Sequence, residues 1–154
     1  MKKIVILTFL LAFLQSCKKN EEGVPCLTPP PEFTLFINKN SEVYKEFITQ
    51  GREIDKAHIS LYREEERVKK QYQIQFHYAK KADKNEYLVV STQLGFQNDV
   101  YTGKTETLYL QNATKTYKIE VNGYMKDTNG CGVVAVTNEI YVDGTKIEVP
   151  YLAK

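Results

Sequence analysis

The clearest indication of fold in this chain is the stretch Ile140-Tyr141-Val142-Asp143-Gly144-Thr145-Lys146-Ile147. Asp-Gly favours the two positive φ angles of a type I′ turn, and the residues on either side alternate between apolar and polar. The stretch therefore predicts a tight antiparallel hairpin. In the matching register Ile140 lies opposite Ile147, and both side chains face a hydrophobic core.

Alternation of the same kind recurs along the rest of the chain. Apolar residues at every second position predict strands around residues 33–37, 57–63, 70–78, 87–90, 108–110, 117–121 and 133–136. Residues 41–50 show helical spacing instead, with Ser41 as a possible N-cap and Gly51 just beyond the end, so a short helix or a turn-rich crossover is expected there. About seven to nine short strands with one such interruption predict an all-β fold, an antiparallel β-sandwich.

The first sixteen residues have the composition of an export signal. Lys2 and Lys3 precede an apolar run, residues 4–14, that is too short to span a bilayer. Removing residues 1–16 leaves 138 of the 154 residues, which is enough for one hydrophobic core. The chain has 21 basic and 19 acidic residues, so loss of the two lysines leaves 19 of each. A mature chain without net charge is not expected to bind nucleic acid.

The export signal ends in a motif that resembles the lipobox of bacterial lipoproteins, Leu14-Gln15-Ser16-Cys17. The resemblance implies cleavage before Cys17, a diacylglyceryl group on its sulfur and acylation of its new amino group. Several acyl chains on one residue anchor a protein stably in a membrane. An ordinary secretory signal, in which Cys17 is incidental, is the alternative.

Residues 17–31 are predicted to form a lipid-anchored tether with a proline-rich end, followed by a single domain over residues 32–154. Within the tether, Lys19, Glu21 and Glu22 resemble the short charged signal that directs Bacteroidota-type lipoproteins to the cell surface. The resemblance implies an outer-membrane lipoprotein of the cell envelope that is displayed externally. Attachment facing the periplasm is the alternative.

Two cysteines remain when Cys17 carries the lipid, Cys26 and Cys131. Exported compartments are oxidising, and a remaining pair of cysteines there is usually joined. We therefore predict a structural disulfide that closes a loop of about a hundred residues and stabilises the fold by roughly 4–5 kcal/mol. No Cys-x-x-Cys spacing supports a redox or metal-binding role for this pair.

Taken together, these features are similar to those of small Bacteroidota lipoproteins of uncharacterised function. The shared features are the lipobox, the charged tether, the late Cys131, and Cys26 followed by Pro29-Pro30-Pro31 and Phe33. The resemblance implies an immunoglobulin-like or transthyretin-like sandwich. It implies no activity, and it transfers no catalytic residue.

Two histidines are the only candidates for metal or acid–base chemistry, because motifs of hydrolases, zinc proteases, phosphate-binding loops and EF-hands are absent. If residues 57–63 and 70–78 pair with Ile59 opposite Phe76, then His58 lies opposite His77. Two imidazoles could begin a zinc or copper site, but no third ligand is evident. We therefore expect surface histidines without a metal, no cofactor and no catalytic residue.

The predicted function is that of a non-enzymatic interaction module, held at a membrane by Cys17, whose partner is an envelope protein. The alternative is a glycan-binding or capture lipoprotein, in which exposed tyrosines stack on sugar rings. The candidates for such stacking are Tyr62, Tyr101, Tyr109 and Tyr141. This alternative requires three or more tyrosines to form one flat, exposed patch.

Overall fold

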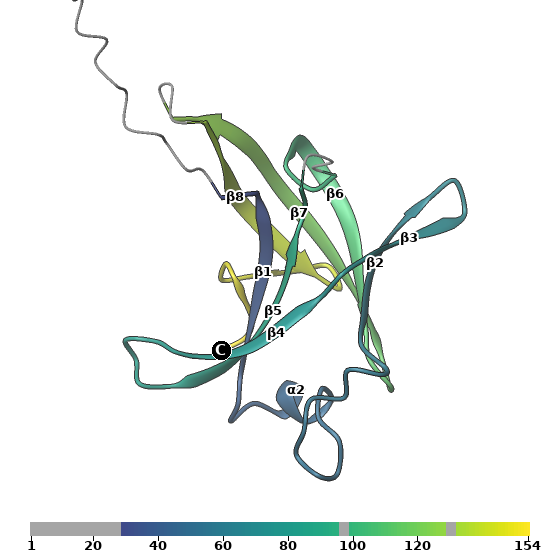
Figure 1. The fold of residues 1–154 in the computed structure, drawn as a ribbon, viewed down its shortest axis with the longest axis vertical. Helices are drawn as coiled ribbons and strands as arrows, with labels where there is room; N and C mark the ends of the chain where they lie inside the picture. Colours follow the sequence, from purple (N-terminus) through teal and green to yellow (C-terminus); the bar gives the residue numbers. More distant parts are fainter. Residues whose placement is uncertain (1–28, 96–98, 129–131) are drawn as a thin grey trace, which may run out of the picture.

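The computed structural model describes residues 29–95, 99–128 and 132–154, and these form ten strands and one short helix (Figure 1). In chain order the elements are β1 (Glu32–Asn38), α2 (Glu42–Lys45), β2 (Ser60–Glu65), β3 (Val68–Tyr72), β4 (Gln75–Lys80), β5 (Glu86–Gln93), β6 (Thr102–Gln111), β7 (Thr116–Asp127), β8 (Val133–Val142), β9 (Thr145–Ile147) and β10 (Tyr151–Ala153).

These strands form two sheets that pack as a β-sandwich, which confirms the predicted fold class. One sheet has the order β10-β1-β5-β4, and the other has the order β3-β2-β6-β7-β8-β9. Neighbouring strands are antiparallel, except that the short β10 runs parallel to β1. The sequence pattern does not predict β10, because three residues are too few to show a period.

The core lies between the sheets and is built from alternate residues of the strands. From β1, Phe33, Leu35 and Ile37 are each at most 2% exposed, whereas Thr34 and Phe36 point to the other face. Full burial of an apolar side chain of this size contributes about 1.5–3 kcal/mol. The facing sheet supplies further large, fully buried side chains of this core, among them Leu61, Leu108, Leu110, Ile119 and Ile140.

The hairpin formed by the end of β8 and β9 has the predicted register. Ile140 pairs with Ile147, and Asp143 and Gly144 both have positive φ angles, 50° and 79°. The Asp143 carboxylate also accepts a hydrogen bond from the backbone N–H of Lys118 at 2.9 Å. The turn is therefore set by its own two residues and is also bonded to β7.

The predicted interruption at residues 41–50 contains α2, a single helical turn. Ser41 caps it, because its Oγ accepts a hydrogen bond from the backbone N–H of Tyr44 at 3.2 Å. Phe47, immediately after the helix, is fully buried. The segment is thus a short helix that places Tyr44 and Phe47 in the core, followed by irregular chain up to β2.

The predicted continuous strand over residues 70–78 is wrong. The chain leaves the six-stranded sheet after β3 and joins the four-stranded sheet as β4, so that Leu61 pairs with Tyr72 and not with Ile74. A strand can keep its alternation through such a crossing, because both sheets of a sandwich face the same core. Alternation therefore could not distinguish one strand from two.

Candidate functional site

Several residues predicted to be functional lie outside the described part of the chain. These are the lipidation residue Cys17, the export-signal residues Lys19, Glu21 and Glu22, and the disulfide pair Cys26 and Cys131. Lipidation, export and the disulfide therefore stay predictions.

The two histidines do not face one another, so the predicted register that paired them is wrong. His77 lies on β4 opposite Val89 of β5, whereas His58 precedes β2 and donates from Nδ1 to the Asp55 carboxylate at 2.8 Å. Among residues 29–95, 99–128 and 132–154, no group of three or more histidine, cysteine or acidic side chains could hold a metal ion.

The four candidate tyrosines do not form one exposed platform. Tyr62 and Tyr101 are each only 5% exposed. The ring of Tyr62 stacks on that of Tyr109, with the ring centroids 5.3 Å apart. The Nζ of Lys69 lies 4.1 Å from the centroid of the Tyr62 ring. Tyr101 belongs to the core, and its hydroxyl donates to the backbone carbonyl of Glu32. Only Tyr109 and Tyr141 remain partly accessible.

The surface feature that best fits a binding site is a chain of three adjoining hollows along β4, which we call the β4-edge groove. Their volumes are about 490, 670 and 550 Å³. Lys56 lines both the first and the second hollow, and Arg52 and Tyr78 line both the second and the third. The hollows are therefore neighbours, and the residues of β4 that line them are Gln75, Phe76 and Tyr78.

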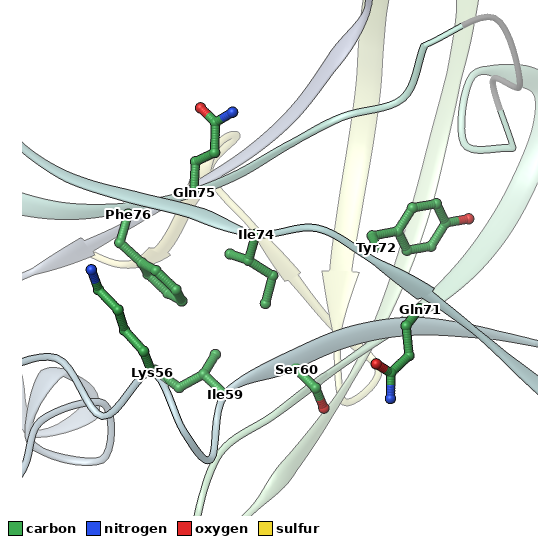
Figure 2. A pocket seen from close by; sticks show the side chains of 8 residues that line it. All are labelled: Lys56, Ile59, Ser60, Gln71, Tyr72, Ile74, Gln75 and Phe76. Carbon is green, nitrogen blue, oxygen red and sulfur yellow. The ribbon is translucent and has the colours of Figure 1, made fainter.

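The first hollow is lined by both apolar and polar side chains (Figure 2). Ile74 points into it from the segment that joins β3 to β4, and Phe76 points into it from β4. Ile59 points toward them from the chain before β2. Lys56 lies beside the ring of Phe76, whereas Gln75 points away from the space. The hollow therefore offers polar groups and a cation beside three apolar side chains.

The second and third hollows lie on either side of Tyr78. The Tyr78 hydroxyl shares a hydrogen bond of 3.0 Å with that of Tyr44, and the Nζ of Lys39 lies 4.8 Å from the centre of its ring. Burial, together with the bond to Tyr44, raises the pKa of Tyr78 to about 12. Tyr78 is therefore neutral at ordinary pH, and its ring is held between α2 and the groove.

β4 is an edge strand, and its outer backbone groups border this groove. The backbone N–H of Lys39 donates to the carbonyl of Glu86, so Glu86 directs its backbone groups toward β1. The backbone N–H of Lys81 donates to the carbonyl of Asn85, so Lys81 directs its backbone groups toward the β5 side. These two bonds fix which residues of β4 direct their N–H and C=O toward β5 and which direct them away. In that alternation, every second residue of β4 directs its N–H and C=O away from β5. The outward-directed residues are Phe76, Tyr78 and Lys80, and none of the described strands pairs with them.

On the wall of the groove opposite β4, two basic side chains form no ion pair with any described residue. Of the basic residues lining the hollows, Lys39 pairs with Glu86 and Lys45 with Glu42. Within the described residues, neither Arg52 nor Lys56 forms an ion pair. The lining also contains two acids, Glu53 and the histidine-bonded Asp55, so that four cations face two anions across the three hollows.

The backbone of Arg52 lies in a tight turn. Its backbone N–H donates to the carbonyl of Thr49 at 2.9 Å, and its φ angle is 63°, in the left-handed region that few non-glycine residues adopt. Thr49 in turn donates its N–H to the carbonyl of Glu53. The turn presents the arginine toward the hollows, and the sequence shows no sign of it beyond Gly51.

Two clusters of hydrogen-bonded polar side chains connect the walls of the groove to neighbouring strands. On one side, the Asp99 carboxylate accepts from the Nζ of Lys70 and from the hydroxyl of Tyr72, and Arg63 donates to the Asp99 carbonyl at 2.6 Å. Burial and the nearby Asp99 carboxylate raise the pKa of Tyr72. This cluster joins β2 and β3 to the chain before β6, directly ahead of the crossing to β4.

On the other side, Glu46 links the segment after α2 to the six-stranded sheet. Its carboxylate accepts from the hydroxyl of Tyr117 at 2.6 Å and from Nδ2 of Asn112 at 3.3 Å. Burial, and then the bond to Glu46, raise the pKa of Tyr117. The irregular chain from Phe47 to Lys56 is thereby tied to β7 at its start.

No helix of the described residues has the length and apolar character needed to cross a membrane. Comparisons with protein-family models, with curated proteins and with solved structures find no match to this chain. The assignment to an immunoglobulin-like or transthyretin-like topology therefore stays a prediction.

Proposed function

We propose that this chain is a lipid-anchored interaction module of the cell envelope, which binds a partner protein at the β4-edge groove without catalysing a reaction. The observation that carries the proposal is the backbone edge at Phe76, Tyr78 and Lys80, which pairs with none of the described strands and lies beside hollows that can receive side chains. Edges of this kind pair with an added strand of another polypeptide.

The edge is suited to binding because the protein leaves it accessible. Short length and charged residues commonly protect edge strands from unwanted pairing. At the other edge of the same sheet, β10 has only three residues. β4 has six residues, and two of them are aromatic, the half-buried Phe76 and the exposed Tyr78.

The proposal includes the anchor and the location expected from the sequence. Acyl chains on Cys17 would hold the domain at the outer membrane, and the signal at Lys19, Glu21 and Glu22 would place it on the outer face. A glycan-binding function is the alternative. It is less well supported, because only Tyr109 and Tyr141 of its four candidate tyrosines are not buried, and the stacking patch requires three.

Site-specific photocrosslinking in intact cells tests the proposed groove. A photoreactive phenylalanine in place of Ala57, which lines the second hollow, is expected to give a discrete crosslinked product. The same group in place of Thr116, an exposed residue of β7 away from the groove, is expected to give none.

Recognition of the β4 backbone is then tested in the protein that carries the photoreactive group at position 57. Tyr78→Pro removes an outward-directed N–H without removing a bond to β5, since proline is tolerated on the free side of an edge strand. Tyr78→Val loses the same ring but keeps the amide. We expect the crosslink to survive in the valine variant and to disappear in the proline variant. Equal products at positions 57 and 116, or a proline variant that crosslinks as well as the valine variant, would refute the groove as the binding site.

A further inference from the structure

We infer that the far end of the β7–β8 hairpin is a membrane-contact site, which lies against the lipid surface that holds the proposed anchor. This end, which we call the β7–β8 arm, comprises residues 124–127 of β7 and 133–136 of β8. The inference rests on the anchor in the proposed function and adds how the domain is oriented toward the lipid. It follows from the exposed apolar residues of the arm and from its position beside the start of β1.

Exposed apolar side chains are concentrated on the arm. Among the described residues, the exposed large hydrophobic side chains are Val68, Tyr78, Tyr124, Val133 and Val134. The last three belong to the arm, where Val133 is 48% exposed and Val134 is 37% exposed. Successive residues of a strand point to opposite faces, so the two valines expose apolar surface on both faces of the hairpin. A rigid protein surface would cover one face, whereas a fluid lipid layer can surround both.

The arm is exposed because the sandwich ends before it. β6 pairs with β7 only as far as Tyr124, and β9 pairs only with residues 140–142 of β8. In the described chain, no third strand therefore flanks residues 125–127 or residues 133–136. The fully buried core residues of β7 and β8, Ile119, Val121 and Ile140, all lie on the other side of this boundary. The valines of the arm thus have no core to enter.

Tyr101 joins the base of the arm to the point where the chain enters the domain. Its hydroxyl donates to the carbonyl of Glu32, the first residue of β1, at 3.1 Å and accepts from Oγ1 of Thr137 at 3.4 Å. Its ring packs so closely on Gly123 that a Cβ atom there would lie 2.7 Å from it. Figure 1 shows the start of β1 and the arm at the same end of the molecule. An anchor at Cys17 would therefore hold this end of the domain nearest to the membrane.

The arm is suited to the interfacial layer of a membrane and not to its hydrocarbon core. It carries one basic and one acidic residue, Lys126 and Asp127, and neither forms an ion pair within the described residues. Charged side chains and unpaired backbone groups are costly in hydrocarbon, so these groups stay at the level of the lipid headgroups. Tyrosine is enriched at that level, and Tyr124 supplies one. Because the arm has no net charge, its contact depends on apolar burial and not on anionic lipid.

Contact at the arm leaves the β4-edge groove accessible. The wall of the groove opposite β4 is built from α2 and the irregular chain before β2. These segments lie at the end of the molecule away from the arm (Figure 1). A domain that lies on its arm therefore directs this wall away from the lipid, and the groove can receive a partner while the arm is in contact.

Quenching of a single tryptophan by brominated lipid tests the inference. The chain has no tryptophan, so Tyr124→Trp adds one reporter on the arm. The full-length protein is isolated with its lipid anchor and reconstituted in phosphatidylcholine vesicles, with or without bromine on the acyl chains next to the headgroups. We expect brominated vesicles to lower the tryptophan emission about twofold, because the arm lies at the boundary between headgroups and acyl chains.

Matched variants assign the quenching to the arm. Thr116→Trp places the reporter on an exposed residue at the other end of β7 and is expected to show no quenching. Val134→Glu, added to Tyr124→Trp, puts a carboxylate opposite Lys126 and is expected to abolish the quenching. Val68→Glu, which changes the exposed valine of the β2–β3 hairpin, is expected to leave the quenching unchanged. Circular dichroism confirms that each variant is folded.

Flotation of the vesicles separates this inference from the proposed function. Protein that floats with the vesicles but shows no quenching of the Tyr124→Trp variant would overturn the membrane contact and leave the anchor intact. The contact would also be overturned by equal quenching of the Thr116→Trp variant, or by quenching that persists with Val134→Glu. Emission that shifts to shorter wavelength without quenching would show a protein covering the arm, which overturns it too. Protein that does not float would refute the anchor and this inference together, whereas the crosslink at position 57 tests the groove independently.

Discussion

At the scale of single residues, Glu46 shows how one side chain can hold a binding surface in place. Tyr117 is 4% exposed, and its hydroxyl donates to the Glu46 carboxylate. A buried hydroxyl that loses its only acceptor costs more free energy than the bond itself contributes. Glu46 therefore affects both the stability of the fold and the position of the groove wall that begins at Phe47.

We predict that Glu46→Ala lowers the free energy of unfolding by about 1–3 kcal/mol, because it leaves the Tyr117 hydroxyl without an acceptor. Urea unfolding followed by circular dichroism measures the change. Tyr117→Phe is the matched control and is expected to cost less. In the Glu46→Ala/Tyr117→Phe double variant the losses should not add. Strict additivity of the two losses would show that the two residues are not coupled.

At the scale of elements, the start of β1 and the middle of β8 meet at Tyr101. The Tyr101 hydroxyl donates to the carbonyl of Glu32 at 3.1 Å and accepts from Oγ1 of Thr137 at 3.4 Å. Cys26 lies six residues before Glu32, and Cys131 lies six residues before Thr137. Two segments of equal length thus extend from one point, each able to span at most about 20 Å. The disulfide stays a prediction, because Cys26 and Cys131 both lie outside the described residues.

Loss of the disulfide is expected to lower the free energy of unfolding by roughly 4–5 kcal/mol, because the bridge would close a loop of about a hundred residues. Cys26→Ser, Cys131→Ser and the double variant should show the same loss, since each removes the same single bond. Denaturant unfolding gives the three values. Non-reducing peptide mapping of the protein isolated from the envelope provides the direct check, and two free thiols there would contradict the prediction.

At the scale of the whole molecule, the proposed lipid anchor would determine how far the domain reaches from a membrane. The described strands begin at Glu32, fifteen residues after Cys17. An extended tether of that length reaches roughly 50 Å. Such a tether would let the β4-edge groove approach partners well away from the lipid surface.

Cys17→Ala is expected to remove the anchor, because acylation requires the thiol of this residue. The variant should remain as an unprocessed precursor or leave the membrane fraction, as seen by fractionation and immunoblotting. The unchanged protein, treated with protease on intact and on lysed cells, shows which side of the membrane carries the domain. A variant with normal processing and unchanged membrane attachment would refute the lipobox.

Much of the fold was predictable from neighbouring residues. The turn at Asp143 and Gly144, the register of Ile140 with Ile147 and the cap at Ser41 all depend on residues close together in the chain. Strand positions followed from alternation for the same reason. The predicted facing of His58 and His77 failed because it required a choice of pairing partner, and β5 pairs with β4 instead.

What the sequence by itself determined is therefore the local structure: where the strands run, where the hairpin turns and which side of each strand is apolar. Only the tertiary structure decided that residues 70–78 cross between the sheets, and that Arg52 and Lys56 lie opposite the free edge of β4. The physical reason is that periodicity and φ angles are properties of adjacent residues. Sheet order and groove walls instead depend on which distant segments bury their apolar faces together, and several arrangements satisfy the same alternation.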